Sequence, residues 1–377
     1  MQSIIFTVTN DLSYDQRMIR ICTSLANNGY AVTLIGRKVK QSVPLSAKAF
    51  TQKRLFCFFS KGIGFYVEYN VRLFVWLLFQ KADCICAIDL DTILPCFFVS
   101  KIKKTKRVYD AHELFCEMKE IVNRASRYKI WKCIERFAVP KFTNGYTVCK
   151  PIADEFEKMY GVKYKVIRSL PVHSIANSST IENILENTTK DQLQTSNDLF
   201  IIYQGAVNEG RSFETLIPAM KEVKIPLHIY GDGNFYTETK ELIAANQLQQ
   251  KVLLKGKLEP SFLKKITSRA YAGITIFENN GLSNYLSLAN RFFDFIMAGI
   301  PQICVNYPAY NELNKEFRVA LLITDTSSKT IADALNLLLT DAVLYEQLKQ
   351  NCIIAREVLN WQQEEKKLIT YYKQILG

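Results

Sequence analysis

Short apolar runs alternate with segments of helical periodicity along the chain. Residues 4–8 have the pattern of a buried strand, apolar positions then recur at helical spacing up to Asn28 and Gly29, and a second strand pattern follows at 31–35. Further strand patterns in the first half lie at 84–88, 108–109, 145–148 and 164–167. Continuous apolar strands separated by helices are typical of a parallel sheet covered by helices.

The same rhythm restarts after a polar segment. Residues 172–198 are rich in Ser, Thr, Asn and Gln and lack an apolar period, which predicts a linker or surface loop. Strand patterns then follow at 199–203, 227–230, 252–255, 272–276, 302–305 and 320–323. We therefore predict an α/β protein with two Rossmann-like doubly wound domains, at residues 1–171 and 199–360, that face a central cleft. The helical pattern at 361–377 is expected to pack back on the first domain.

Composition narrows the class of protein. The chain has 377 residues, of which 48% are hydrophobic and 22% charged, and this excludes a disordered protein or a single small module. Its longest apolar run, residues 73–79, is far shorter than the ~20 residues that span a bilayer. We therefore expect a cytoplasmic protein. Ten cysteines without regular spacing and only three histidines predict no metal site and no disulfide framework.

The basic residues are concentrated in the first half. Residues 1–171 hold 28 of the 48 lysines and arginines but only 14 of the 36 acidic residues, and aromatic residues are frequent between Lys53 and Lys81. This pattern suits an anionic membrane surface, and we expect peripheral attachment to the inner face of the cytoplasmic membrane. Nucleic acid is the competing partner, but no nucleic-acid-binding motif accompanies the charge, so we predict none. The plainest alternative is a solvated basic face over buried aromatics.

Glycine-containing loops follow two strands of the second half. Gly205 begins a loop that runs to Arg211, and Gly231 and Gly233 follow the next strand. Glycines let backbone N–H groups approach an anion, and an arginine can bind phosphate oxygens, so the loops are candidates for phosphate binding. From the residues alone, an ordinary turn is the favoured interpretation of each loop.

The stretch from Asn284 to Pro301 is the richest candidate site. Asp294 interrupts an apolar helical face, and its carboxylate could accept hydrogen bonds from two ribose hydroxyls. The helix entrance at Leu288, Ala289 and Asn290 offers N–H groups to a diphosphate, and Arg291 adds a cation. Alternatively, Asp294 faces solvent or pairs with a lysine.

These motifs resemble those of a known family. The pattern Tyr-x-Ser-Leu-x-Asn-Arg-Phe-Phe-Asp-Phe-Ile-Met-Ala-Gly-Ile-Pro at 285–301, placed after the two glycine loops, is similar to the donor-binding half of the GT-B retaining glycosyltransferases of family 4. Residues 108–113, Val-Tyr-Asp-Ala-His-Glu, resemble the family's strand-end Asp-x-His motif. The resemblance covers nearly the whole chain apart from the linker.

The resemblance implies roles for individual residues. It implies that Asp294 binds the donor ribose, that Arg211 neutralises the diphosphate leaving group, and that His112 contacts the transferred sugar. Residues Ser287, Leu288, Ala289, Asn290 and Arg291 would lie along the sugar and diphosphate, together with the glycines of the two loops. The implied reaction needs no metal or other cofactor: the donor is a nucleotide sugar whose base is unknown, with UDP or GDP first, and the acceptor is a glycan or lipid-linked molecule.

Three positions depart from the family's pattern. Leu286 stands where the family has the first carboxylate of its Glu-x7-Glu motif, Ser212 where a lysine often follows the arginine, and Ala289 where proline is common. Arg291 could replace the missing cation.

The acceptor side offers four further candidates. Asp89 and Asp91 follow the strand at 84–88, while Asp15 and Arg17 follow the first strand. We predict that these residues face the acceptor, although Asp15 and Arg17 could instead be charges at a helix N-terminus. Asp89-Leu90-Asp91 superficially resembles a metal-binding Asp-x-Asp motif but lacks a nearby nucleotide loop.

The sequence thus predicts a hexosyltransferase-type enzyme of bacterial polysaccharide, lipopolysaccharide or capsule synthesis. Two other functions stay open. One is a nucleotide-sugar epimerase of related architecture, which would need no acceptor. The other is a catalytically silent, membrane-associated scaffold. It stays open because Leu286 and Ser212 replace a carboxylate and a lysine of the family's pattern.

Overall fold

The computed structural model describes residues 1–13, 15–40, 42–173 and 199–377, so the predicted linker at 172–198 lies almost entirely outside the described residues. The described chain forms two compact units. The first contains Met1–Ser169, Asn279–Ser287 and Gln363–Gly377, and the second contains Leu170–Glu278 and Leu288–Gln362.

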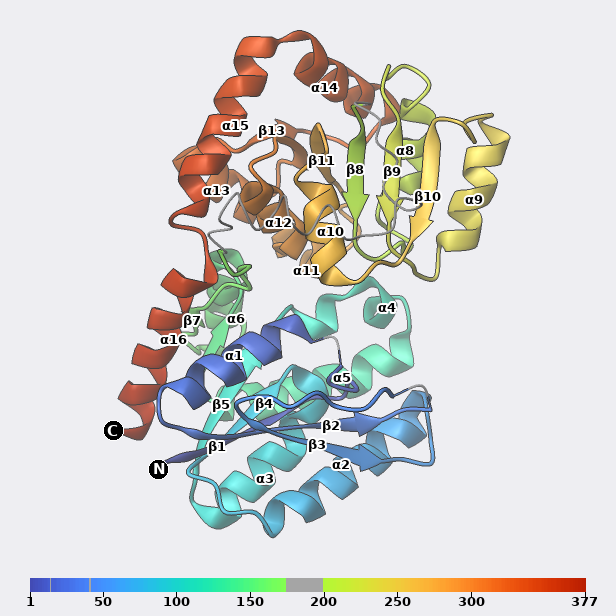
Figure 1. Ribbon diagram of the computed structural model, residues 1–377. Helices are drawn as coiled ribbons and strands as arrows, with labels where there is room; N and C mark the ends of the chain where they lie inside the picture. The colour runs from blue at the N-terminus through green and yellow to red at the C-terminus, as the bar shows by residue number, and fades with distance from the viewer. Residues whose placement is uncertain (14, 41, 174–198) are drawn as a thin grey trace. The chain divides into compact units, whose positions relative to one another are not determined.

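The first unit contains a seven-stranded parallel sheet in the order β3-β2-β1-β4-β5-β6-β7 (Figure 1). Its strands are β1 (Ser3–Thr7), β2 (Ala31–Lys38), β3 (Thr51–Phe56), β4 (Cys84–Ile88), β5 (Lys106–Ala111), β6 (Gly145–Thr147) and β7 (Lys165–Val166). Its helices are α1 (Gln16–Asn27), α2 (Gly62–Leu78), α3 (Ile93–Lys103), α4 (Lys119–Val122), α5 (Ala125–Ala138), α6 (Lys150–Tyr160), α11 (Leu282–Leu286) and most of α16 (Trp361–Leu376). The short 3-10 helices are η1 (Leu90–Thr92), η2 (Phe115–Glu117) and η3 (Val139–Lys141).

The second unit contains a six-stranded parallel sheet in the order β10-β9-β8-β11-β12-β13. Its strands are β8 (Ile201–Gln204), β9 (Leu227–Tyr230), β10 (Val252–Gly256), β11 (Ala272–Thr275), β12 (Gln302–Val305) and β13 (Ala320–Ile323). Its helices are α8 (Phe213–Ala219), α9 (Tyr236–Ala245), α10 (Pro260–Thr267), α12 (Asn290–Ala298), α13 (Pro308–Phe317), α14 (Ser328–Thr340) and α15 (Ala342–Arg356).

Both sheets reverse their strand order once. The reversal lies between β1 and β4 in the first unit and between β8 and β11 in the second. Loops that leave the carboxyl ends of such strands diverge to opposite faces of the sheet, and doubly wound folds bind ligands at this point. The predicted architecture of two Rossmann-like parallel sheets is therefore confirmed, and the predicted ligand-binding loops start at these strand ends.

One strand was not predicted. β3 is the edge of the first sheet, and along its sequence Thr-Gln-Lys-Arg-Leu-Phe no residue is fully buried. An edge strand pairs on one side only, so it needs no continuous apolar run and leaves little signal in the sequence. In the described ranges, no helix combines the length and hydrophobicity needed to cross a bilayer.

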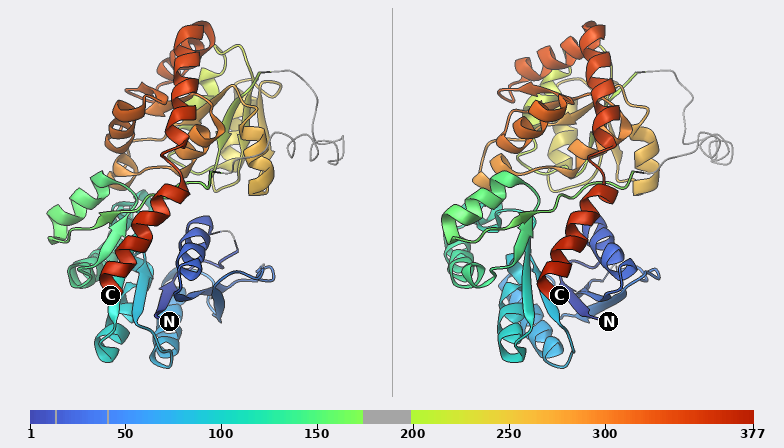
Figure 2. Two further views of the ribbon diagram at one scale, coloured as in Figure 1. Left: turned by 60° about the vertical axis from the view of Figure 1, so that its left-hand side comes forward. Right: turned by 90° about the vertical axis from the view of Figure 1, so that its left-hand side faces the viewer.

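The C-terminal helix α16 packs on the first sheet (Figure 2). The ring of Tyr372 is fully buried, with its centroid 5.9 Å from that of Phe6 and 6.4 Å from that of Tyr146. Polar contacts align the same helix, since Ser24 donates to Glu365 over 2.7 Å and the Arg168 N–H donates to Glu364 over 2.8 Å. The end of the chain is therefore part of the core of its first unit.

Replacing Tyr372 by alanine should destabilise the protein strongly. Loss of a buried aromatic ring typically costs about 3–5 kcal/mol. In urea unfolding followed by circular dichroism, we expect the transition of the first unit to move to a clearly lower midpoint. Lys373→Ala, an exposed neighbour on the same helix, is the control and should leave the midpoint unchanged. Equal midpoints for the two variants would show that α16 does not stabilise the first unit.

Candidate functional site

Three loops at the carboxyl edge of the second sheet are joined by backbone hydrogen bonds. The N–H of Gly205 donates to Tyr230 over 3.0 Å, and the N–H of Val207 donates to Asp232 over 3.0 Å. The N–H of Gly231 donates to the carbonyl of Gly256 over 2.9 Å. The loops after β8, β9 and β10 therefore form one continuous edge.

Gly231 and Gly233 make this joining possible. A Cβ atom on Gly231 would lie 1.8 Å from the carbonyl oxygen of Gly205, and one on Gly233 would lie 2.2 Å from Oδ1 of Asn208. Any side chain there would force the loops apart. The structure thus gives both glycines a packing role, and their contact with a donor stays a prediction.

Gln204, the last residue of β8, is hydrogen-bonded to two of the predicted donor residues, Asp294 and Arg291. Its side-chain N–H donates to the Asp294 carboxylate over 2.9 Å, and its side-chain carbonyl accepts from the Thr267 hydroxyl over 2.7 Å. Its backbone carbonyl accepts from Arg291 over 3.3 Å. Because both ends of the amide are fixed, Gln204 orients the carboxylate of Asp294, which is half-buried on α12.

Two arginines are held against aromatic rings in this unit. The guanidinium of Arg291 is buried, 4.5 Å from the ring centroid of Tyr203, and that of Arg211 lies 5.6 Å from the ring centroid of Phe277. Cation–π contact restricts the positions of both charges. A Cβ on Gly205 would be 3.8 Å from Nη1 of Arg291, so this cation lies beside the first glycine of the loop.

One of the backbone N–H groups at the start of α12 is already hydrogen-bonded within the protein. The N–H of Ala289 donates to the hydroxyl of Tyr310 over 2.7 Å, so this predicted diphosphate donor already has a partner. Leu288 is buried, and Asn290, the first residue of the helix, is exposed.

The residues just before α12 belong to the first unit. Ser287 donates to the carbonyl of Asn284 over 2.9 Å, and the carbonyl of Leu286 accepts from the thiol of Cys149 over 3.2 Å. Leu286 is buried. The predicted donor residues are therefore divided between the two units after Ser287.

Ser212 occupies the position of the missing lysine. Its φ of 58° is left-handed, and its buried hydroxyl has no hydrogen-bond partner among the described residues. A serine at this position supplies no cation.

A charged network occupies the carboxyl edge of the first sheet. Asp110, at 0% exposure on β5, has one carboxylate oxygen 2.8 Å from Arg17, and its other oxygen is 3.3 Å from Nε2 of His112. Arg17 also donates to the carbonyl of Ile167 over 3.1 Å. Although predicted to face the acceptor, Arg17 is buried on α1 and supports Asp110.

His112 lies between two carboxylates. Its Nδ1 is 3.5 Å from Asp89, whose other oxygen accepts from the His112 backbone N–H over 2.8 Å. Burial alone would lower the pKa of His112, but the charges of Asp89 and Asp110 raise it to about 9. Burial also opposes ionisation of Asp110, yet Arg17 and His112 hold the pKa of that carboxyl below its ordinary value. At neutral pH His112 is therefore an imidazolium whose charge is balanced by two carboxylates, rather than a base.

Asp91 and Asp15 lie on the loops around this network. Burial, together with the charge of Asp89, raises the pKa of Asp91 to about 7, and its carboxylate accepts from the Thr9 hydroxyl over 2.5 Å. Asp15 is the N-cap of α1, where it accepts from the Met18 N–H over 3.0 Å and from Asn10 over 2.6 Å. Within the described ranges, no three His, Cys, Asp or Glu side chains are arranged to hold a metal ion.

Three residues of these networks were not predicted from the sequence: Gln204, Asp110 and Tyr310. Gln204 directly precedes the glycine loop, and Asp110 lies within the Asp-x-His motif, so their positions gave a usable signal. Tyr310 gave none, because it lies on α13 and contacts Ala289, which precedes α12 and is 21 positions away in the chain.

Residues 186–353 match the family model described as Glycosyl transferases group 1. The matched range includes the glycine loops, both arginines and Asp294. No curated protein sequence matches the chain.

Solved structures of similar fold cover nearly the whole chain. Sucrose-phosphate synthase from Thermosynechococcus elongatus is 16% identical with a TM-score of 0.76, over 99% of this chain and 99% of that one. HepE from Anabaena, in complex with UDP-glucose, is 12% identical with a TM-score of 0.74, over 99% and 100% of the two chains. WaaG, a glycosyltransferase involved in lipopolysaccharide biosynthesis, is 14% identical with a TM-score of 0.73, over 98% and 99%. The chain therefore has the GT-B fold.

The charge on His112 should be measurable by NMR. We expect its imidazole to titrate near pH 9, and Asp89→Asn to lower that pKa by about 1–3 units, because an opposite charge at this distance is lost. His228 is the internal control: burial, assisted by Lys255, lowers its pKa to about 4, and Asp89→Asn should not alter it. Titration of His112 near 6.5 in the wild type would contradict the network.

The same charge should make stability depend on pH. Because the pKa in the folded protein exceeds the ~6.5 of unfolded histidine, the stabilisation is fully present below pH 6.5 and is lost as pH rises through about 9. The difference in unfolding midpoint between wild type and His112→Gln should shrink over that range.

Proposed function

We propose that this protein is a glycosyltransferase that transfers a sugar from a nucleotide-sugar donor to an acceptor hydroxyl, with retention of anomeric configuration. The observation that carries the proposal is that the range matching Glycosyl transferases group 1 contains the joined loops and the Gln204–Asp294–Arg291 network. The fold it shares with WaaG, and with HepE in complex with UDP-glucose, supports a nucleotide-sugar donor, with UDP or GDP as the first bases to test.

Asp294 would bind the ribose of the donor. An ionised carboxylate only accepts hydrogen bonds, and the amide of Gln204 occupies one side of it. The two ribose hydroxyls would donate hydrogen bonds to this carboxylate. Since Leu286 is buried and apolar, the first carboxylate of the family's motif has no counterpart here, and Asp294 would carry ribose recognition.

Arg211 and Arg291 would stabilise the leaving group. When the bond between the sugar and the diphosphate breaks, negative charge grows on the phosphate oxygen, and fixed cations stabilise that charge more in the transition state than in the ground state. Arg291 would supply the charge that Ser212 does not. The N–H of Ala289 would contribute only if Tyr310 released it.

The first unit would hold the transferred sugar and the acceptor. His112, as an imidazolium, would place a positive charge beside the sugar, while Asp110 and Arg17 fix its charge and position. Asp89 and Asp91 would lie on the acceptor side. These roles require neither a metal nor another cofactor, and the proposed acceptor is a glycan or lipid-linked molecule of bacterial surface polysaccharide, lipopolysaccharide or capsule synthesis. The lipopolysaccharide role given for WaaG is consistent with that acceptor class.

We also propose that the first unit binds an anionic membrane surface through helix α2. Five apolar side chains spaced four residues apart form an exposed row along it, which we call the α2 stripe. Its members are 47% to 81% exposed: Ile63, Val67, Val71, Val75 and Phe79. Monomeric proteins rarely expose a continuous apolar surface without a partner for it.

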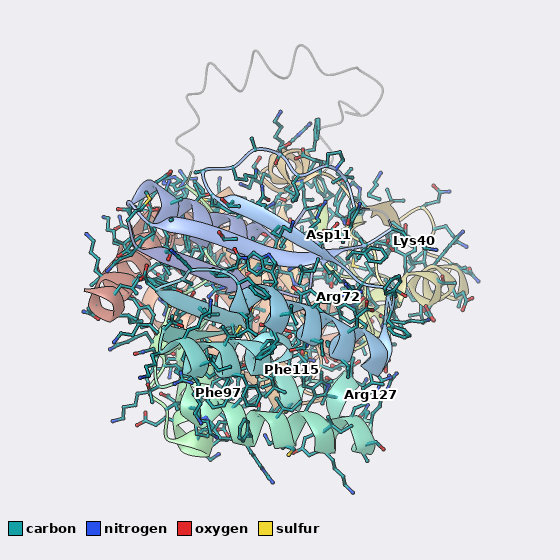
Figure 3. All side chains as sticks on the ribbon, turned by 90° about the horizontal axis from the view of Figure 1, so that it is seen from below. Asp11, Lys40, Arg72, Phe97, Phe115 and Arg127 are labelled. Atoms are coloured by element: carbon teal, nitrogen blue, oxygen red, sulfur yellow. The ribbon has the colours of Figure 1, made fainter. Side chains whose placement is uncertain are left out.

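Neighbouring elements extend this surface. Figure 3 views the molecule from below, the side on which α2 and α3 lie in Figure 1. Phe58 and Phe59 are exposed just before α2, and α3, which packs against α2, exposes Phe98 and Ile102. Exposed lysines lie on or next to these elements: Lys61 and Lys81 on either side of α2, Lys101 and Lys104 at the end of α3, and Lys53 on β3. The combination fits a bilayer, because apolar side chains enter the headgroup region while each lysine attracts anionic lipid by about 1 kcal/mol. Contrary to the aromatic pattern of the sequence, Phe65 and Tyr69 are buried and the row itself is mainly aliphatic.

Donor binding should be visible as thermal stabilisation. With UDP-, GDP-, ADP- and CMP-sugars tested in turn, one class at about 100 times its Kd should stabilise the protein by about 2.7 kcal/mol. Asp294→Asn should abolish the shift, and Asp333→Asn, a matched change on the surface of α14, should leave it intact. A shift that survives Asp294→Asn would refute the ribose assignment. Stabilisation by no nucleotide would favour the silent scaffold, and conversion of the donor without an acceptor would favour the epimerase.

Membrane attachment should depend on the α2 stripe. The double variant Val67→Glu with Val71→Glu should weaken sedimentation with phosphatidylglycerol vesicles about tenfold or more, because it places charge where apolar contact is needed. Val343→Glu on α15, at a valine that is 82% exposed in the second unit, is the control and should bind as the wild type does. Equal binding by both variants would exclude α2 as the membrane contact.

A further inference from the structure

A polar cavity of about 280 Å³ lies at the amino edge of the first sheet. Lys106 begins β5, Asn144 directly precedes β6 and Lys165 begins β7, and all three line the cavity. Tyr371 and Gln374 of α16 form its other side. Because the strands are parallel, the cavity is at the edge opposite His112, about 20 Å away along β5 at about 3.3 Å per residue. It therefore belongs to neither set of predicted site residues.

The cavity is cationic. Lys106, Lys163 and Lys165 line it, and no acidic residue does. Lys163 forms an ion pair at the rim, where its Nζ is 3.4 Å from the half-exposed carboxylate of Glu157. In the described part of the chain, neither Lys106 nor Lys165 has a carboxylate within ion-pair distance. All three lysines are exposed, and their combined positive charge would attract an anion to the cavity.

A buried tyrosine hydroxyl adds a second, independent observation. Tyr371 is 8% exposed, and its ring packs edge-on against Tyr146 at 5.4 Å and Tyr372 at 5.6 Å. Among the described residues, its hydroxyl has no hydrogen-bond partner. Nearby hydroxyls do have partners, since Tyr164 donates to the carbonyl of Phe142 over 3.1 Å. A buried polar group without a partner costs free energy, and a hydrogen bond to a ligand in the cavity would offset that cost.

We propose that this cavity is a binding site for a phosphorylated ligand. The lysines would neutralise the phosphoryl charge, and the Tyr371 hydroxyl and the amides of Asn144 and Gln374 would donate hydrogen bonds to its oxygens. The volume exceeds that of one phosphate and suits a diphosphate or a phosphate ester. The same chemistry occurs in a soluble diphosphate and in a lipid headgroup. Since α16 supplies Tyr371, the bound ligand would also fasten the C-terminal helix to β5, β6 and β7.

The test titrates the full-length protein with inorganic diphosphate in a calorimeter. It is made in an Arg211→Ala background, so that the proposed donor site in the second unit does not contribute. We expect saturable binding that Tyr371→Phe weakens about tenfold, because a hydrogen bond to a charged group is lost while the ring is kept. Lys106→Ala with Lys165→Ala should weaken it further, and Lys158→Ala, an exposed lysine of α6, should have no effect.

A second arm distinguishes the source of the phosphate. The same variants are sedimented with phosphatidylglycerol vesicles in the presence of Val67→Glu and Val71→Glu, which remove the α2 contact. Binding of free diphosphate that depends on Tyr371 supports a soluble ligand, and vesicle binding that depends on Tyr371 supports a headgroup. If neither probe binds, or if Tyr371→Phe binds both as tightly as its parent does, the proposal is overturned.

Discussion

The central constraint on this molecule is that the carboxyl ends of its parallel strands carry polar groups that must be paired where they are buried. Asp110 is ionised at 0% exposure because Arg17 and His112 supply two positive charges to its carboxylate. In the second unit Gln204 pairs the polar groups: its side chain contacts Asp294 and Thr267, and its backbone carbonyl accepts from Arg291. Each network lies near a reversal of strand order, where the loops diverge and leave room for a ligand.

The two networks differ in charge and therefore in chemistry. The second unit presents two arginines restrained by aromatic rings and one oriented carboxylate, groups that suit the nucleoside diphosphate of the proposed donor. The first unit presents an imidazolium between carboxylates, which suits hydroxyl groups of a sugar and an acceptor. The first unit also carries the α2 stripe, which suits a bilayer, and the lysine-lined cavity at the amino edge of its sheet, which suits an anion.

Much of this arrangement could be predicted from sequence, and the exceptions have physical reasons. Strands such as β9, β12 and β13 match their predicted ranges because buried parallel strands leave continuous apolar runs. The edge strand β3 was missed because it is half-polar. Arg17 and Asp110 are 93 positions apart in the chain, so their ion pair left no local pattern. The hydrogen bond between Ala289 and Tyr310, which are 21 positions apart, left none either. The assignment of Asn279–Ser287 to the first unit was likewise not predicted, since its contacts, such as that of Leu286 with Cys149, are also distant in sequence.

Hydrogen–deuterium exchange with and without UDP-glucose tests the central claim, that the second unit holds the donor, most directly. The account predicts slower exchange in peptides that cover Gly205–Arg211, Gly231–Phe235 and Leu288–Asp294, with the remainder of the second sheet unchanged. If UDP-glucose fails, the same experiment with the other nucleotide sugars decides between a wrong base and a wrong site. Protection confined to the first unit, or no protection with any nucleotide sugar, would contradict the claim.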